Sequence, residues 1–289
     1  CKIFKDPLAA FRKRFYLRED TVYLCGNSLG LASRDAENSL SIVLDEWKYE
    51  GVQLWSQNNN KFLKYSAYLA KLMAPLVGAD AKEIALSGST TVSIHQCIST
   101  FYKPTEDRYK ILVDDVNFSS DRYAVDSQVR LKGYDPAEHF HLTPGMCGWF
   151  GNRIGTPHLL SMGPLEGSLK MFLEAGMTNV RLKSLKITAY LMYLSDLRLS
   201  YYGFDIGNPR EDDRRGGHVC LRHHEAYRIS IALKNMGVVQ DFRPPNVIRI
   251  TPAALYTSYE EVYRVVEMIL LIVKNETYKS ISTRRSVVV

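Results

Sequence analysis

The sequence has 289 residues, of which 46% are hydrophobic and 24% are charged. This composition is globular and excludes neither one large domain nor two smaller ones. The net charge of +6 comes from 37 basic and 31 acidic residues, an excess too small to identify a nucleic-acid partner.

The cysteines and the apolar runs narrow the class of protein. The five cysteines have no CxxC spacing, which favours reduced thiols over a disulfide framework or a zinc site. They are Cys1, Cys25, Cys97, Cys147 and Cys220. The longest apolar run, Met268–Val273, ends at Lys274 and is far too short to span a membrane. We therefore expect a cytoplasmic enzyme or binding protein with no metal site.

The N-terminal part predicts a short strand at Tyr23-Leu24 that breaks into a turn. Gly26, Asn27 and Gly30 can all adopt positive φ in this turn. The leucines among them indicate a loop held against the core, a common place for ligand contacts, although a surface turn remains an alternative. Helices follow at residues 34–49 and 61–77, the second stopped by Gly78.

Small hydroxyl residues gather at positions 87–93 (Ser-Gly-Ser-Thr-Thr-Val-Ser), between the apolar run Ile84–Leu86 and a predicted helix over residues 91–102. A strand that turns through small residues into a helix leaves backbone N–H groups unpaired, and hydroxyls beside them favour a phosphate or another anion. Ser and Thr are also the usual caps of an ordinary helix. Both interpretations stay open on this stretch alone.

A second strand–turn–helix pattern follows. Residues 110–116 predict a buried strand, and residues 117–123 predict the turn into the next helix. Two successive units of this kind indicate a parallel α/β sheet with functional groups at the C-terminal ends of its strands.

The rest of the chain predicts an α+β arrangement. Residues 134–152 contain no clear strand or helix, and residues 157–194 are helical with a break near Gly176. Strands at residues 216–221 and 247–250 enclose a helix that ends at Gly237. The last helix begins with Ser258 and Glu261 at capping-box spacing.

Several blocks, in the same order and over nearly the whole chain, resemble kynureninase, a pyridoxal-phosphate (PLP) enzyme of the aspartate-aminotransferase fold type I. The blocks are Leu24–Leu31, Gly88–Val92, Asn117–Asp121, Gly148–Gly151, Gly155–Pro157, Arg215–Val219, Pro245–Ile250 and Leu255–Ser258. The resemblance implies a large α/β domain with a mainly parallel sheet and a smaller α+β domain. Their predicted limits are residues 46–162 for the large domain, with 1–45 as an N-terminal arm and 163–289 as the connecting helix and C-terminal small domain.

The resemblance also implies roles for single residues. Thr90 and Thr91 match positions that bind the cofactor phosphate, and Arg249 matches the arginine that holds the substrate α-carboxylate, for which its planar fork is suited. The other cofactor-side matches are Phe118, Ser119, Ser120, Asp121, Trp149 and Thr156. Asn27 and Ser28 match the substrate side, and Trp55 is a candidate wall for an aryl ring. His218 matches a structural strand and is left out of the catalytic set.

The sequence departs from the family in its middle part, where the interval of residues 135–147 is short and a further family segment is missing between Asn152 and Arg153. PLP chemistry of this type needs a Schiff-base lysine and an acid opposite the pyridine nitrogen, both expected between Tyr134 and Gly148. Residues 135–147 contain no lysine, so the catalytic residues are unknown. Either the sequence omits a disordered internal segment, or the segment is deleted and the protein is a catalytically dead relative. We favour the first, because losing central strands would leave strand edges and apolar faces unpaired.

The resemblance predicts hydrolysis of L-kynurenine, or its 3-hydroxy form, to an anthranilate and L-alanine in tryptophan catabolism. It also predicts a homodimer with the active site at the interface, and no membrane or nucleic-acid partner. A cysteine-desulfurase-like lyase of the same fold and a dead ligand-binding relative are the alternatives. The lyase needs a nucleophilic cysteine on a mobile loop, and none of the five cysteines lies in such a motif.

Overall fold

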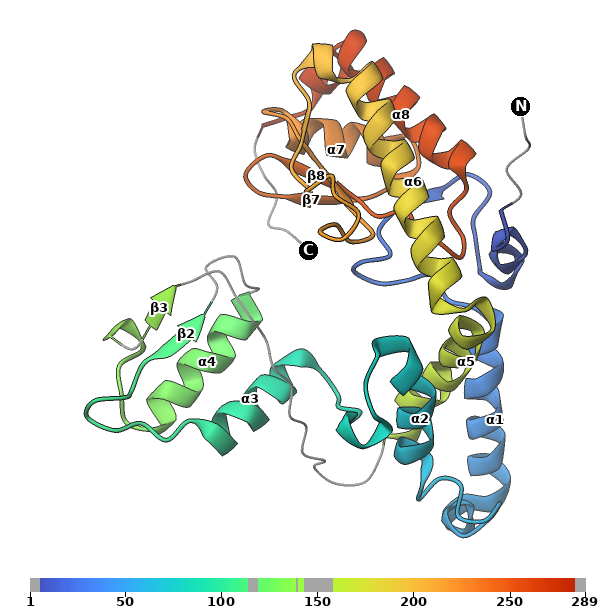
Figure 1. Ribbon diagram of the computed structural model, residues 1–289, viewed down its shortest axis with the longest axis vertical. Coiled ribbons are helices and arrows are strands. Elements are labelled where there is room, and N and C mark those ends of the chain that lie inside the picture. Colours follow the sequence, from blue (N-terminus) through green and yellow to red (C-terminus); the bar gives the residue numbers. More distant parts are fainter. Residues whose placement is uncertain (1–5, 114–118, 139, 143–157, 284–289) are drawn as a thin grey trace. The chain divides into compact units, whose positions relative to one another are not determined.

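The computed structural model describes residues 6–113, 119–138, 140–142 and 158–283. Contacts divide the chain into two compact units, which we call the terminal unit (residues 1–41 and 170–289) and the central unit (residues 42–169). Two helices cross the boundaries between them along the chain, α1 (Arg34–Glu50) and α5 (Leu159–Ala175) (Figure 1).

The terminal unit has a four-stranded antiparallel sheet in the order β4-β5-β8-β7, and β1 pairs with β6 in parallel. Its helices are α6 (Met177–Arg198), α7 (Ala226–Asn235) and α8 (Tyr259–Lys274), with short 3-10 turns at Ala9–Arg14, Ser200–Tyr202 and Thr277–Ser280. Its strands are β1 (Val22–Tyr23), β4 (Asp205–Ile206), β5 (Val219–Arg222), β6 (Val238–Val239), β7 (Asp241–Arg243) and β8 (Val247–Ile250). Figure 1 shows α6 and α8 side by side.

The sheet of the terminal unit has one apolar and one polar face, because side chains alternate along a strand. Val219, Leu221, Ile248 and Ile250 are fully buried on the apolar face, where they join a core with α6, α7 and α8. The other face carries the alternate positions, which are mostly polar and include Arg222 on β5 and Arg249 on β8. This alternation fixes which side chains can form a site.

The N-terminal arm is tied to the terminal unit by ion pairs. Arg12 donates to both carboxylate oxygens of Glu261 at 2.7 and 2.8 Å, and the buried Lys183 ammonium lies 2.7 Å from Asp6. Glu261 also completes the capping box of α8, with its carboxylate accepting from the Ser258 backbone N–H at 2.8 Å. The expected capping box is confirmed, and one buried carboxylate holds both the helix start and the arm.

The central unit contains α2 (Tyr65–Val77), α3 (Thr90–Phe101) and α4 (Ser119–Leu131), with two short strands, β2 (Ile111–Val113) and β3 (Phe140–Leu142), and 3-10 turns at Gly51–Trp55, Ala81–Glu83 and Pro136–Glu138. The two strands pair in parallel, with Ile111 opposite Phe140. The side chain of Leu112 in β2 is 63% exposed. The pair therefore leaves apolar surface open, as expected of a sheet that has no third strand within the described residues.

The helix ends that the sequence predicts from a glycine lie where they were expected. Gly78 ends α2 in the left-handed conformation at φ 70°, and Gly176 separates α5 from α6 at φ 75°. The predicted break near Gly176 and the stop at Gly78 are confirmed, because glycine adopts positive φ without steric penalty.

Other expectations are corrected. The apolar run Ile84–Leu86 is not a strand, because it has no partner strand among the described residues. Gly26, Asn27 and Gly30 do not have positive φ; Gly26 is needed for a close contact instead. Residues 134–152, expected to lack regular structure, contain β3.

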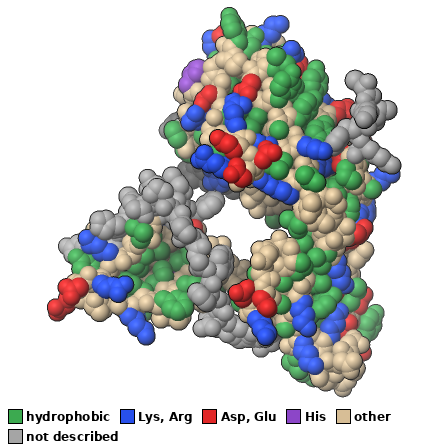
Figure 2. All heavy atoms as spheres, in the orientation of Figure 1, with side chains coloured by type: hydrophobic (Ala, Val, Ile, Leu, Met, Phe, Trp, Pro, Cys, Tyr) green, Lys and Arg blue, Asp and Glu red, His purple; other side chains and the backbone are tan. Residues whose placement is uncertain are grey.

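The fold class is a mixture of helices and small sheets. A large parallel sheet was expected, but within the described part of the chain the only parallel strand pairs are β2–β3 and β1–β6, besides a single parallel bridge between Cys25 and Thr251. No described helix is long and apolar enough to cross a membrane. Basic and acidic side chains are interspersed on the visible face of the terminal unit (Figure 2).

Candidate functional site

The hydroxyl residues of positions 87–93 lie at the N-terminus of α3. Ser89 caps the helix, its hydroxyl accepting from the Val92 backbone N–H at 3.3 Å, and the hydroxyls of Ser87 and Ser93 are 2.6 Å apart. Thr90 and Thr91 are the first two residues of the helix, where backbone N–H groups have no intrahelical acceptor. The geometry fits an anion at this end, and it equally provides a helix cap.

The second predicted cofactor loop leads into α4. Ser119 and Ser120 are its first two residues, and Asp121 is the acidic residue of its first turn. An acid there stabilises a helix through the partial positive charge of the N-terminus, so Asp121 has a structural role as well as its predicted one. Phe118, Trp149 and Thr156 lie outside the described residues.

Helices α3 and α4 lie side by side in the central unit (Figure 1). Gln128 of α4 connects them, since its amide oxygen accepts from the Ser99 hydroxyl at 3.0 Å and its nitrogen lies 2.9 Å from His95 Nδ1. The two helices that carry the predicted cofactor residues are therefore fixed to each other by packing and by side-chain hydrogen bonds.

Arg249 lies on the polar face of the terminal unit's sheet, where it is opposite Asp241 of β7 and Cys220 of β5. Its Nη2 donates to Asp241 Oδ2, and the same carboxylate oxygen accepts from Arg243 Nε at 2.8 Å. The Arg249 and Asp241 side chains are 21% and 20% exposed. One carboxylate thus serves two guanidinium groups, and the cluster carries a net positive charge.

The loop after β1 brings Asn27 to Arg249. Backbone hydrogen bonds hold this loop beside the end of β8, with Thr251 N donating to Leu24 O at 2.9 Å. We assign the Asn27 amide so that its oxygen accepts from Arg249 Nε at 3.1 Å and Nη2 at 2.6 Å, while its nitrogen donates to Thr251 Oγ1 at 2.6 Å. The opposite orientation would place amide N–H groups against guanidinium N–H groups. The structure therefore brings together two residues that the sequence assigned to the substrate side.

Burial and nearby charges shift the pKa values of the titratable groups around Arg249. Burial raises the pKa of the Cys25 thiol, and the Asp241 carboxylate raises it further. Burial also raises the pKa of the Cys220 thiol. For His218, burial lowers the pKa and the Arg249 charge lowers it further. The surroundings of Arg249 therefore contain neutral thiols and a histidine that resists protonation, which leaves the arginines to attract an anion.

The remaining predicted substrate residues occupy other positions. Ser28 is exposed in the β1 loop, where its backbone N–H donates to Cys25 O at 3.1 Å. Trp55 ends a 3-10 turn of the central unit and is half-buried against a core that includes Leu54, Phe62 and Tyr65. Packing accounts for the position of Trp55, and its role as an aryl wall stays a prediction.

Sequence reasoning missed Asp241, Arg243 and Thr251. A signal was available, because the alternating Asp-Phe-Arg of residues 241–243 and the strand at 247–250 are separated by Pro-Pro-Asn, which is typical of a turn. A hairpin with this connection places an acid on the same face as Arg249.

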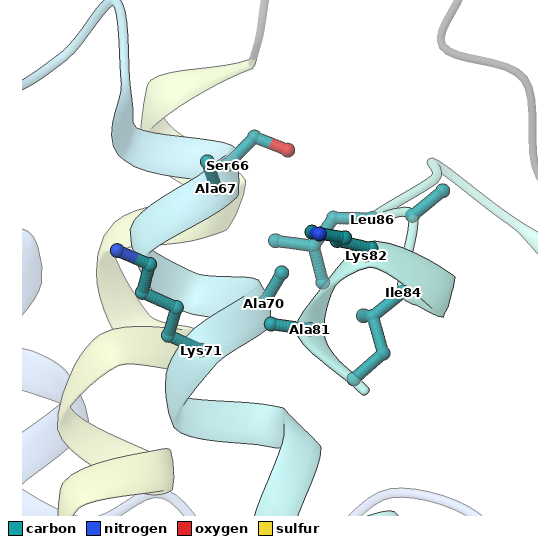
Figure 3. Close-up of a pocket in the computed structure, with 9 residues that line it drawn as sticks. Ser66, Ala67, Ala70, Lys71, Ala81, Lys82, Ile84 and Leu86 are labelled. Carbon is teal, nitrogen blue, oxygen red and sulfur yellow. The ribbon is translucent and has the colours of Figure 1, made fainter. Parts of the chain in front are cut away.

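A cleft of about 370 Å³ in the central unit lies between α2 and residues 81–86 (Figure 3). Its walls are Ser66, Ala67, Ala70, Lys71, Ala81, Lys82, Ile84, Ala85 and Leu86. Figure 3 shows the amine of Lys71 directed away from the cleft. No residue predicted for the site lines it, and no cluster of His, Cys, Asp or Glu in the described residues could hold a metal ion.

Solved structures share the fold. A NifS-like protein is similar with a TM-score of 0.64 and 12% identity, covering 88% of this chain and 100% of that chain. A cysteine desulfurase from Thermococcus onnurineus NA1 has a TM-score of 0.62 and 13% identity, covering 92% of this chain and 98% of its own. A variant of the lyase C-DES with glycine covalently linked to its PLP cofactor has a TM-score of 0.67 and 10% identity, covering 90% and 98%. At these identities the likeness shows the fold alone.

Curated relatives are much closer in sequence. The kynureninase of Geobacillus thermodenitrificans is 36% identical over 409 aligned positions, which cover 98% of this chain and 96% of the relative. A kynureninase of Shouchella clausii is 34% identical over 408 positions, covering 98% and 95%. Since 98% of 289 residues is about 283, roughly 126 of the 409 positions have no residue in this chain. The chain is thus shorter than its relatives inside the aligned span.

The C-terminal part of the chain matches a family model of its own. Residues 180–269 match the kynureninase C-terminal domain, the stretch that contains Asp241, Arg243 and Arg249. Together with the similarity over 98% of the chain, this match settles the family, and the chain therefore belongs to the kynureninases, which are hydrolases.

Proposed function

We propose that the protein hydrolyses L-kynurenine, or 3-hydroxy-L-kynurenine, to anthranilate, or 3-hydroxyanthranilate, and L-alanine. The observation that carries the proposal is Arg249, a guanidinium fixed by Asn27 and Asp241 in a chain similar to kynureninases from end to end. Arg249 would bind the α-carboxylate of the amino-acid substrate, since a planar guanidinium pairs well with a carboxylate.

PLP is the proposed cofactor, and the described residues fit one part of it. Thr90 and Thr91 begin α3, and the unpaired backbone N–H groups of a helix start, with hydroxyl residues there, are the donors that a phosphate needs. Ser119, Ser120 and Asp121 begin α4 and are proposed as neighbours of the cofactor, together with the predicted Phe118, Trp149 and Thr156. When bound, PLP supplies a ring that withdraws electrons from the substrate α-carbon.

The residues do not fit the covalent part of that chemistry. The interval of residues 135–147 contains no lysine, and the chain is about 126 positions short of its relatives within the alignment. We therefore assign no covalent or proton-transfer step to a residue of this chain. Its proposed contribution is to bind and orient, through Arg249 for the carboxylate, α3 for the phosphate, Asn27 and Ser28 on the substrate side and Trp55 beside the aryl ring.

The same observation favours a second candidate, a kynureninase relative that binds ligands without turning them over. The two candidates predict different masses for the protein purified from its own cells. A mass above 33.0 kDa, the mass of this chain, is expected if an internal segment carries the missing lysine. A mass of 33.0 kDa would exclude that account and favour the ligand-binding relative.

Activity tests the reaction directly. The natural protein, supplied with PLP, is expected to release fluorescent anthranilate from L-kynurenine. Arg249→Lys keeps the charge but loses the fork, so kcat/KM should fall by about tenfold or more. The matched control is Arg222→Lys, an arginine of β5 paired with Asp205, which should leave kcat/KM unchanged. A PLP-loaded protein larger than 33.0 kDa that leaves kynurenine intact would refute the proposed reaction.

We further propose that the central unit corresponds to the cofactor-binding domain and the terminal unit to the small domain, in a cytosolic homodimer. Exposed apolar side chains of the central unit support self-association, namely Trp47 at 55%, Tyr49 at 83% and Val52 at 81% exposure. Light scattering coupled to size-exclusion chromatography tests the dimer, and a monomer at micromolar concentration would contradict it.

A further inference from the structure

The guanidinium of Arg249 is occupied on two sides before any ligand arrives. The Asn27 oxygen accepts from Nε and Nη2, and the Asp241 carboxylate accepts from Nη2. Among the described residues, Nη1 makes no hydrogen bond. A ligand carboxylate that binds two guanidinium nitrogens needs adjacent donors, so it must take over the Nη2 donor that Asp241 uses.

Asp241 has a second cation within reach. Its Oδ2 also accepts from Arg243 Nε at 2.8 Å, two positions further along β7 on the same face of the sheet. Asp241 can therefore release Arg249 and remain paired. This arrangement lowers the cost of release, since a half-buried carboxylate left with no cation is strongly destabilised.

We propose that Asp241 is a positioning residue for Arg249, a resident carboxylate that holds the Nη2 donor until a ligand carboxylate replaces it and then pairs with Arg243 alone. This proposal rests on the proposed role of Arg249 in binding the substrate α-carboxylate. Asn27 keeps the other edge of the guanidinium fixed throughout, so the fork stays oriented while one of its partners changes.

If a ligand carboxylate replaces Asp241 on Arg249, substitutions of Asp241 and Arg243 should have opposite effects on the affinity for that carboxylate. Asp241→Asn removes the competing charge and should tighten carboxylate binding. Arg243→Gln removes one of the two arginines that pair with Asp241. Asp241 then holds Arg249 more strongly, competes better with the ligand carboxylate and should weaken its binding. The Arg243 effect acts through Asp241, so it should largely disappear when Asp241 is already asparagine.

The experiment uses the full 289-residue chain and acetate as the probe, at constant ionic strength. The NMR signal of the Arg249 Nε–H group, assigned by its loss in Arg249→Gln, reports the titration without any need for turnover. We expect Asp241→Asn to bind acetate about three- to tenfold more tightly, and Arg243→Gln about threefold more weakly. In the double variant the Arg243 effect should fall below about twofold.

Asp205→Asn is the matched control, because Asp205 pairs with Arg222 on the same polar face and the substitution changes the charge equally. It should change acetate affinity by less than about twofold. The proposal is overturned if Asp241→Asn fails to tighten binding, if Asp205→Asn tightens it as much, or if the Arg243 effect persists in the double variant. Dispersed NMR spectra of each variant confirm that it is folded.

A separate titration keeps this inference distinct from the proposed function. L-Kynurenine and its methyl ester differ in the carboxylate that Arg249 would bind. If the ester shifts the Arg249 signal as strongly as the free acid does, the proposed role of Arg249 fails. The acetate titration alone decides whether Asp241 competes with a ligand carboxylate for the Arg249 guanidinium.

Discussion

The hydroxyl of Tyr256 fills the space that a side chain on Gly26 would need. A β-carbon built on Gly26 would lie 2.6 Å from the Tyr256 hydroxyl oxygen, with the next atom, Ala253 Cβ, at 3.6 Å. Tyr256 is buried, and its ring packs edge-on against Phe15 at 4.9 Å between ring centroids. The turn that carries Asn27 therefore packs against the core through a close contact between the Gly26 backbone and the Tyr256 hydroxyl.

Gly26→Ala should destabilise the protein by about 1–3 kcal/mol, because the buried tyrosine cannot move aside without disturbing its neighbours. Tyr256→Phe removes the colliding oxygen and should restore most of that loss in the double variant. Urea unfolding measures both. Gly30→Ala, in the same loop with no atom within 4 Å of its added carbon, should be nearly neutral. Equal losses at the two glycines would show that the contact is not responsible.

Arg12→Ala should lower the free energy of unfolding by about 1.5–3 kcal/mol, because it leaves the buried Glu261 carboxylate without its bidentate partner. Chemical denaturation gives the value. Arg18→Ala breaks an ion pair with Asp20 in which both side chains are at least 70% exposed, and should change stability by less than about 0.5 kcal/mol. A neutral Arg12→Ala would mean that the Arg12–Glu261 pair does not stabilise the arm.

Stability should fall as the pH is lowered below about 6.5, the ordinary pKa of histidine. His223 is buried, its Nε2 donating to Tyr202 O and its Nδ1 accepting from Glu225 N, each at 3.0 Å. Burial lowers the pKa of His223, and the neighbouring His224 lowers it further. The unfolded chain therefore takes up the proton first, and stability present above pH 6.5 is lost as the pH falls through the folded-state pKa.

His223→Gln should reduce this pH dependence, which for one proton is at most about 1.4 kcal/mol per pH unit. Thermal unfolding from pH 7.5 to pH 5 provides the measurement. A residual slope is expected, because burial also lowers the pKa of His218. An unchanged slope in His223→Gln would exclude His223 as a source.

Tyr65→Phe should destabilise the central unit by about 1–2 kcal/mol. The Tyr65 hydroxyl donates to the buried Glu166 at 2.6 Å, and burial raises the pKa of Tyr65 so that the donor is kept. The Tyr68 hydroxyl makes a longer hydrogen bond of 3.4 Å to the same carboxylate. Tyr68→Phe is therefore the matched control and should lower the free energy of unfolding by less. Urea unfolding followed by circular dichroism compares the two variants, and equal losses would contradict this ranking.

Elements with strong local signals could be predicted from the sequence. The strand Val247–Ile250 and the capping box of Ser258 and Glu261 have the expected bounds and contacts. Their causes are short-range, since glycine conformation, capping and apolar periodicity act within a few residues. The run Ile84–Leu86 has the composition of a strand but not the structure, because a strand needs a partner that composition does not reveal.

For the candidate site too, some residues could be identified from the sequence, whereas their contacts could not. Arg249 and Asn27 were found by resemblance, and their contact with each other follows from the register of β8 and from the loop after β1, which residue identity alone does not give. Asp241 and Arg243 were missed because the hairpin register decides whether an acid lies opposite an arginine or one residue away on the other face. The roles of Phe118, Trp149 and Thr156 stay predictions.

The open two-stranded sheet of the central unit has a consequence for how the protein must be handled. Leu112 is 63% exposed on β2, and Phe101, at the end of the preceding helix, is 62% exposed. Within the described residues this sheet has two strands, and a short parallel sheet with unpaired edges and apolar side chains is a template for strands from other molecules. The 289-residue chain should therefore aggregate more as its concentration rises, and a chain in which further strands cover Leu112 should stay in solution under the same conditions.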